Sequence, residues 1–307
     1  MPSKPKPKPK PRQQPTGLEV VSPIWLLKAI GMVILAAIIC GYLSLCLLFY
    51  QGQWQLVLHP THSSDKPQPT QNLIRFGPDE TALPQLTGLW IPSDSAARYA
   101  TTTILFLPSG DGSLADAKPT LDRLHNLGLN VFAFDYRGYG FSAATNPNNL
   151  RMSQDAESAW QYLTTSRAIP ASHIIPYGTG VGASLAAALA ATHPEVPALI
   201  LDAPQTDLLP IVQRDKRARL LPASLLFHEH FPMTTALETL PTPKLLLSTS
   251  STPAYKSAAS PKMTVELNHP TALLGNDALY TQTLTRFLDQ YLAQHLQAPN
   301  PQAPALP

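Results

Sequence analysis

The chain has 307 residues, of which 44% are apolar and 14% are charged, so it has enough apolar side chains to form a core. This composition excludes a chain that is disordered throughout. Residues 1–16 contain five cations and no acid, and removing these cations from the net charge of +2 leaves −3 for the rest. A mildly acidic body without a basic stripe argues against nucleic acid as the main partner.

Proline and cysteine are unevenly distributed along the chain. Six of the 33 prolines lie in residues 1–16 and four lie in the last nine residues, and such proline-rich ends are extended rather than packed. We therefore expect a basic tail at residues 1–23 and a second tail at residues 298–307. Both cysteines, Cys40 and Cys46, lie in one apolar stretch, so the rest of the chain can form neither a disulfide nor a thiolate zinc site.

The apolar stretch at residues 24–50 predicts one transmembrane helix. Its last part, residues 31–50, carries no charge, and 20 helical residues span ~30 Å, the thickness of the hydrocarbon layer of a bilayer. A cleaved signal peptide is the alternative, but the stretch is longer than a usual apolar signal region and no small-residue cleavage site follows it. We therefore expect an uncleaved signal anchor.

The charges on either side of this helix predict its direction. All the cations of the tail precede it, and residues 51–64 contain no Lys or Arg. The positive-inside rule then keeps the N-terminus in the cytoplasm. We expect a single-pass protein of the inner (plasma) membrane, whose body at residues 51–297 is extracytoplasmic, which means periplasmic in a Gram-negative cell.

In the body, apolar runs of strand length alternate with segments of helix length. Such alternation is typical of an α/β fold, a mostly parallel sheet with helices on both faces, and ligands bind such sheets at the carboxyl ends of the strands. Strands and the turns that follow them are expected at 101–110, 129–138, 173–180, 197–204, 242–249 and 262–269, and helices at 114–128, 153–166, 181–193 and 277–296.

Three motifs occur in a familiar order. D-Y-R-G-Y-G-F-S occupies residues 135–142, G-T-G-V-G occupies residues 178–182 before a helix of small residues, and His269 precedes the last helix. Over residues 56–296 this pattern resembles the α/β-hydrolase fold family, and within it the membrane-anchored Bem46-like subgroup related to the serine aminopeptidases. The resemblance implies an α/β-hydrolase fold and hydrolysis of carboxylic esters or peptide bonds.

The residues that such hydrolysis needs are largely missing. In the family a serine nucleophile occupies the middle of G-x-S-x-G, on a sharp turn where φ is positive, and this position is Gly180. The family acid usually follows the strand at 242–249, where residues 248–252 are all Ser or Thr. Of the triad only His269 is retained, and a triad without its acid is typically ~10⁴-fold slower. Asp202, after a neighbouring strand, is a candidate substitute acid, although a structural or helix-capping role is favoured for it.

The turn that supplies the oxyanion hole in this family also departs from the pattern. Pro108 has no N–H group, and Asp111 places a negative charge where an oxyanion would develop. Ser109 is a candidate substitute nucleophile, although a serine in a turn usually bonds to its own backbone. The expected ligand-binding residues are Ser109, Gly110 and Val181, and the amides at the start of the following helix can attract an anionic group.

Other candidates have simpler interpretations. Thr179 and Ser184 are expected to be packed, and Asp135 and Arg137 are expected to hold their own turn. The H-E-H sequence at residues 228–230 lacks a third ligand, so no metal site is expected there. The glycine-rich turn lacks the Lys-Ser/Thr pair of a phosphate loop, so no nucleotide or other cofactor is expected.

Three functions remain open. The first is a catalytically impaired, membrane-anchored α/β-hydrolase-like protein that binds a small acyl or anionic ligand, or an envelope protein. The second is an active serine hydrolase that uses Ser109 with His269. The third is a structural envelope tether that works through its proline-rich ends.

Overall fold

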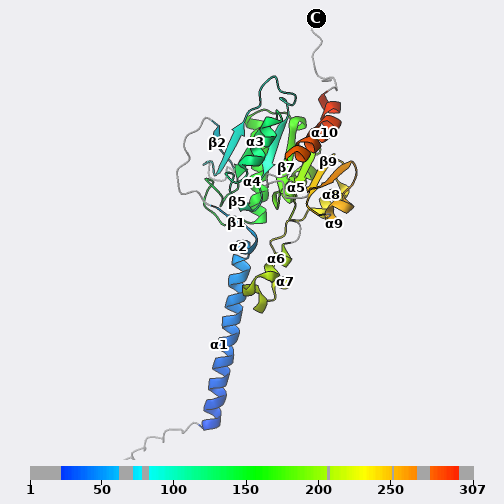
Figure 1. Cartoon of the computed structure of the whole chain (residues 1–307). Coiled ribbons are helices and arrows are strands. Elements are labelled where there is room, and N and C mark those ends of the chain that lie inside the picture. The colour runs from blue at the N-terminus through cyan, green and yellow to red at the C-terminus, as the bar shows by residue number, and fades with distance from the viewer. Residues whose placement is uncertain are drawn as a thin grey trace, which may run out of the picture. The chain divides into compact units, whose positions relative to one another are not determined.

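The computed structural model describes residues 22–61, 72–77, 83–205, 208–250, 252–267 and 277–296. The chain divides into two units, Met1–Leu48 and Phe49–Pro307. The first contains most of α1 (Pro23–Gly52), a 30-residue helix that is long and apolar enough to cross a membrane (Figure 1). None of its residues is buried. The predicted tails lie outside the described residues, except for residues 22 and 23.

The second unit is built on an eight-stranded sheet with the order β10-β9-β8-β7-β4-β6-β3-β2. The pairs β2–β3 and β3–β6 are antiparallel and the other five pairs are parallel. The predicted fold class, a mostly parallel α/β sheet, is therefore confirmed. The strands are β2 (Leu73–Phe76), β3 (Leu86–Ile91), β4 (Thr103–Leu107), β6 (Asn130–Asp135), β7 (Ile174–Thr179), β8 (Leu199–Asp202), β9 (Lys244–Ser248) and β10 (Lys262–Glu266).

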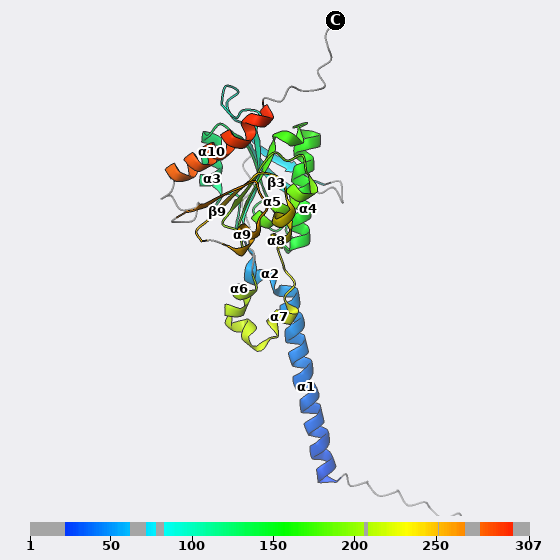
Figure 2. The ribbon, with the colours of Figure 1, turned by 90° about the vertical axis from the view of Figure 1, so that its right-hand side faces the viewer.

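Helices cover both faces of the sheet. Figure 2 shows α3 (Lys118–Asn126) and α10 (Asp277–Leu296) on one face and α4 (Asn149–Gln161) and α5 (Gly182–Thr192) on the other. Successive residues of the central strands belong to two different apolar clusters, one under each helix pair. This alternation explains why the central strands are apolar throughout: both of their faces are buried.

Two helices begin at residues other than those expected. The helix expected from residue 114 begins at Lys118, because residues 113–116 form a turn in which Asp116 Oδ2 accepts a hydrogen bond from Ser113 N at 2.8 Å. The helix expected from residue 153 begins at Asn149, because the side chain of Asn148 caps it by accepting a hydrogen bond from Arg151 N at 2.8 Å.

The remaining elements are short and lie mainly at the carboxyl edge of the sheet or in connections. They are α2 (Trp54–Val57), β1 (His59–Pro60), which pairs in parallel with β5 (Asp111–Gly112), η1 (Tyr162–Ser166), η2 (Ala171–His173), α6 (Leu209–Arg214), η3 (Lys216–Leu220), α7 (Ala223–Leu226), α8 (Thr234–Thr239) and α9 (Pro253–Ser257).

Candidate functional site

The turn between β7 and α5 has the geometry of a nucleophile elbow without a nucleophile. Gly180, at its apex, has φ of +54°, the left-handed conformation expected for this position. A Cβ atom on Gly178 would collide with the backbone of Gly182, and one on Gly182 would collide with the backbone oxygen of Leu107. The flanking glycines are therefore required because strand and helix approach each other too closely for side chains.

Ser109 occupies the space beside the elbow. A Cβ atom on Gly180 would lie only 2.8 Å from Ser109 Cβ, which is closer than two carbon atoms can approach without a shift. Ser109 Oγ donates a hydrogen bond to Asp111 O at 3.3 Å and accepts one from Asp111 N at 3.4 Å. The serine bonds to the backbone of its own turn, as expected, but these distances are long, so the hydroxyl is only weakly held.

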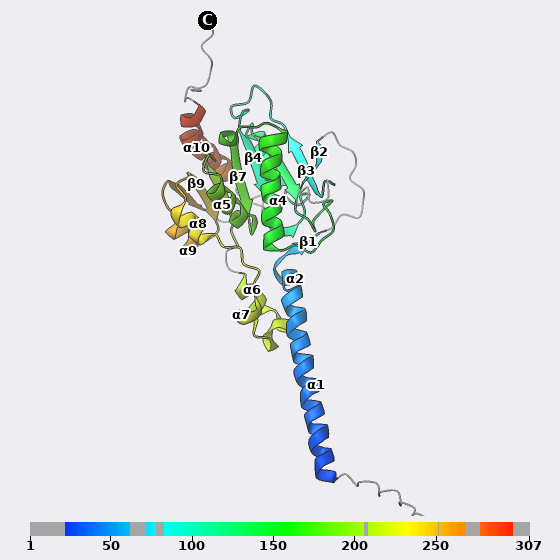
Figure 3. The ribbon, with the colours of Figure 1, turned by 180° about the vertical axis from the view of Figure 1, so that it is seen from behind.

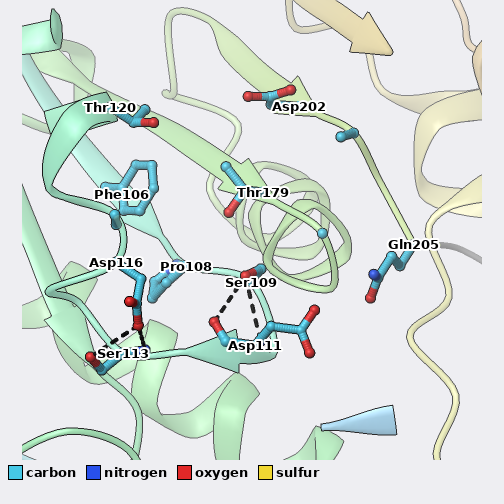
Figure 4. A pocket seen from close by; sticks show the side chains of 13 residues that line it. Phe106, Pro108, Ser109, Asp111, Ser113, Asp116, Thr120, Thr179, Asp202 and Gln205 are labelled. Atoms are coloured by element: carbon cyan, nitrogen blue, oxygen red, sulfur yellow. Dashed lines mark hydrogen bonds between the residues drawn. The ribbon is translucent and has the colours of Figure 1, made fainter. Parts of the chain in front are cut away.

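A cavity of about 290 Å³ opens at this edge of the sheet. Figure 4 shows Ser109, Thr179 and Asp202 around it. Thr179, expected to be a packed turn residue, is half-buried at the end of β7 and contributes to the cavity wall. The lining residues are Phe106, Pro108, Ser109, Asp111, Ser113, Asp116, Ala117, Thr120, Thr179, Gly180, Asp202, Ala203 and Gln205.

Three aspartate side chains belong to the described part of the cavity lining. Among the described residues the cavity is lined by Asp111, Asp116 and Asp202 and by no Lys or Arg. Asp111 Oδ1 lies 2.6 Å from His59 Nδ1, an exposed pair that draws this carboxylate toward β1. Asp116 is held by the hydrogen bond from Ser113 N. The described part of the lining therefore supplies carboxyl groups and no Lys or Arg to pair with an anionic ligand.

Asp202 ends β8 and is 1% exposed. Its Oδ2 accepts a hydrogen bond from Tyr177 Oη at 2.9 Å, and Tyr177 Oη accepts one from Tyr280 Oη at 3.1 Å. Burial raises the pKa of both phenols, so both remain neutral donors. Asp202 does not cap a helix, because the next described helix, α6, begins at Leu209. Instead, the hydroxyl of Tyr177 bonds to its carboxylate, and the hydroxyl of Tyr280 in turn bonds to Tyr177.

The other residues predicted for the site lie apart from the cavity lining or outside the described residues. Val181 is fully buried, and a Cβ atom on Gly110 would lie 3.0 Å from Val181 Cγ2, so these two residues pack against each other behind the turn. Of the three residues predicted to bind ligand, Ser109 is the one among the lining residues. His269 lies outside the described residues. At the end of β9, where the family acid was expected, the hydroxyls of Ser248 and Thr252 are buried without a hydrogen-bond partner.

Two predictions of structural roles are confirmed. Ser184 is buried in α5, and its Oγ donates a hydrogen bond to Phe231 O at 2.8 Å. In the turn after β6, Asp135 Oδ1 accepts a hydrogen bond from Leu114 N at 2.7 Å, and Arg137 Nε donates one to Asp155 Oδ1 at 2.7 Å. None of these three side chains lines the cavity beside the elbow. Asp135 instead lines a separate apolar cavity of about 420 Å³ beneath α3.

The H-E-H sequence is also engaged in the fold. Glu229 Oε2 accepts a hydrogen bond from Asn149 N at 3.0 Å, and His228 N donates one to Gln53 Oε1 at 2.8 Å. Within the described ranges, no group of three His, Cys, Asp or Glu side chains is arranged to hold a metal ion.

Comparison with proteins of known sequence agrees with this architecture. An uncharacterized protein of Mycobacterium tuberculosis (strain CDC 1551 / Oshkosh) is 26% identical over 186 residues, which cover 61% of this chain and 64% of that protein, just under two thirds of its length. Protein bem46 of Schizosaccharomyces pombe is 30% identical over 115 residues, covering 36% of this chain and 38% of that protein. The similarity to Bem46-like proteins is thus confirmed.

Solved structures have the same fold. An esterase of Pyrococcus furiosus superposes with a TM-score of 0.60 at 17% identity, over 76% of this chain and 98% of that one. Mouse alpha/beta hydrolase domain-containing protein 10 superposes with a TM-score of 0.52 at 16% identity, over 71% of this chain and 98% of that one. The family described as serine aminopeptidase, S33, matches residues 104–294, more than half of the chain. The chain therefore belongs to the serine aminopeptidase S33 family of α/β hydrolases.

Proposed function

We propose that the folded unit binds a ligand without hydrolysing it, as a catalytically impaired member of the serine aminopeptidase S33 family. One observation carries this proposal: Gly180 supplies no hydroxyl at the elbow, and Ser109 fills the space where a side chain at that position would begin. Covalent catalysis in this fold requires an activated nucleophile, and the elbow offers none.

The ligand that this cavity suits is small and not anionic. A volume of about 290 Å³ holds a small molecule or one end of a longer one. Phe106, Pro108 and Ala117 present apolar surface to an acyl chain, while Thr179 and Gln205 present polar groups. Because the described lining is negatively charged, we propose a neutral or amine-bearing acyl ligand in place of the anionic ligand expected from the sequence.

We also propose that α1 anchors the protein in a membrane. Its length, its apolar composition and the lack of any buried residue support a single span. The five cations that precede it favour a cytoplasmic N-terminus and an extracytoplasmic folded unit in the inner (plasma) membrane. Protease digestion of sealed inverted vesicles tests this orientation: the folded unit should be protected inside them, and its digestion without detergent would contradict the proposal.

Two assays on the full-length protein in detergent test the binding proposal. We expect no labelling by a fluorophosphonate and no ester hydrolysis, and Gly180→Ser should restore neither, because Ser109 obstructs the new side chain. In thermal unfolding, hexylamine or hexanamide should stabilise the protein more than hexanoate does, and Asp202→Asn should weaken the preference for the amine. Stabilisation by hexanoate alone would contradict the proposed ligand class.

A second candidate is a hydrolase that uses a displaced hydroxyl. The closeness of Ser109 to the elbow favours it, since its Cβ lies within 2.8 Å of the point where a side chain on Gly180 would start. In that case Ser109 would be the nucleophile and His269 the base, with Asp202 as the acid. Fluorophosphonate labelling that disappears in Ser109→Ala and His269→Ala, but persists in Ser184→Ala, would establish this function and overturn the first.

A further inference from the structure

Residues 209–226, which contain α6, η3 and α7, form a segment that we call the cap. The cap follows the carboxyl end of β8, and Figures 1 and 3 show α6 and α7 beyond this edge of the sheet, on the side of α2. The folded unit holds the cap through one apolar face. Val212, Ala218 and Ala223 are buried in the apolar cluster that also lies under α4 and α5.

The outer face of the cap combines exposed leucines with cations. Outside α1, the described part of the chain exposes six large apolar side chains, and three of them are Ile211, Leu220 and Leu225. Leu220 is 79% exposed and Leu225 is 81% exposed, the two highest values in that group. Arg214, Lys216 and Arg219 are exposed within the same segment. Exposed leucines among cations are typical of a surface that lies in the interface of an anionic bilayer.

The cap is also tied to the end of the apolar helix. Gln53 is 1% exposed and bonds to the backbone at the end of α7. Its Nε2 donates a hydrogen bond to Leu226 O at 3.3 Å, and its Oε1 accepts one from His228 N at 2.8 Å. The ring of Tyr50 lies 4.2 Å from the ring of His228, measured between centroids. Tyr50 is the last residue of the apolar stretch at residues 24–50, so these contacts lie where a membrane-spanning α1 leaves the hydrocarbon layer.

We propose that the cap docks on the surface of an anionic phospholipid bilayer, with Leu220 and Leu225 in the interface and Arg214, Lys216 and Arg219 against the headgroups. This inference rests on the proposed membrane anchoring. Because α1 keeps the cap next to the bilayer, the cap can dock even if its own affinity for lipid is low. Each cation near an anionic surface shifts the docking equilibrium by about five-fold. The docked cap brings the carboxyl edge of the sheet, where the cavity opens, close to the lipid surface.

The test uses the full-length protein in nanodiscs that contain lipids with spin-labelled acyl chains. In a Cys40→Ser, Cys46→Ser background, Leu225→Cys carries an environment-sensitive fluorophore. Ser95→Cys is the matched control, because it is exposed but precedes the amino end of β4, the opposite edge of the parallel strands from the cap. A third protein, labelled at Cys40 alone, reports on α1.

In nanodiscs containing phosphatidylglycerol, we expect lipid quenching and blue-shifted emission at Leu225→Cys and neither at Ser95→Cys. The triple variant Arg214→Gln, Lys216→Gln, Arg219→Gln, or phosphatidylcholine alone, should reduce the quenching. Quenching at Cys40 without quenching at Leu225→Cys would overturn docking and leave the anchor in place. Absence of quenching at both positions would overturn the anchor as well. A blue shift at Leu225→Cys without lipid quenching would indicate a protein contact and would also overturn the proposal.

Discussion

Two turns at the carboxyl edge of the same sheet contain glycine because their backbones are left-handed, but their side chains have different roles. After β6, Gly138 and Gly140 have φ of +95° and +48°, and after β7, Gly180 has φ of +54°. In the first turn, charged side chains and a serine hold the backbone. In the second, the apex has no side chain and a neighbouring loop fills the space. The fold thus requires the tight glycine turn, but it does not require a nucleophilic side chain at the apex of that turn.

The turn after β6 is held by buried polar side chains that form hydrogen bonds inside the protein. Asp155 is completely buried and accepts hydrogen bonds from Arg137 N at 2.8 Å and Arg137 Nε at 2.7 Å. Ser142 Oγ donates a hydrogen bond to Asp135 O at 2.6 Å and accepts one from Thr87 N at 2.9 Å. These polar side chains therefore already have hydrogen-bond partners inside the protein and act on the backbone of the turn.

The largest effect is expected from breaking the Arg137–Asp155 pair. Asp155→Ala leaves a guanidinium buried without its partner, which should lower the free energy of unfolding by about 3–5 kcal/mol. Denaturant unfolding of the full-length protein measures the loss. Asp122→Ala is the control, since Asp122 pairs with Lys118 at the surface, and it should change stability little. Equal losses in the two variants would show that the turn after β6 is not held by the pair.

A smaller effect is expected from filling the space at Gly140. In Gly140→Ala the new Cβ would collide with the carboxylate of Asp135, and the residue would keep a left-handed backbone. These two penalties should lower the free energy of unfolding by about 1–3 kcal/mol. Gly52→Ala is the control, because no heavy atom lies within 4 Å of the site of its Cβ. A Gly140→Ala protein as stable as this control would contradict the crowding described here.

At the elbow the expected cost is about 1–2 kcal/mol and depends on Ser109. Gly180→Ala should be destabilising because its Cβ meets Ser109 Cβ, and Ser109→Gly should relieve part of that cost. A double-mutant cycle on the free energy of unfolding measures this coupling. Additive losses would mean that Ser109 does not occupy the space of the missing side chain.

The smallest effect is a dependence of stability on pH. Burial raises the pKa of Asp155 to about 6 even though Arg137 opposes the shift, and burial also raises the pKa of Asp135. Between the ordinary value of 3.8 and about 6, the folded protein binds more protons than the unfolded chain, so stability should fall as pH rises through this window. We expect Asp155 to contribute a slope below about 1 kcal/mol per pH unit, because a single titrating group contributes at most about 1.4 kcal/mol per pH unit.

Asp155→Asn provides the comparison for this prediction. It removes the titrating group but keeps the shape of the side chain, so its unfolding free energy should vary less over the same pH range. Identical pH profiles for the two proteins would show that Asp155 does not supply the slope.

Six of the eight strands, the apolar helix and the departure at the elbow could be predicted from the amino-acid sequence, because each depends on residues that are close together in the chain; the two strands at the antiparallel end of the sheet, β2 and β3, were not predicted. Strand-length apolar runs predicted every central strand, and G-T-G-V-G predicted a left-handed Gly180 without a nucleophile. Tertiary structure alone decided what surrounds that glycine. Ser109, 71 residues earlier, fills its space, and Tyr280 orients Asp202 through Tyr177. The negative lining and the exposed cap also arise only when distant segments meet, since burial and charge around a site depend on neighbours that no local pattern specifies.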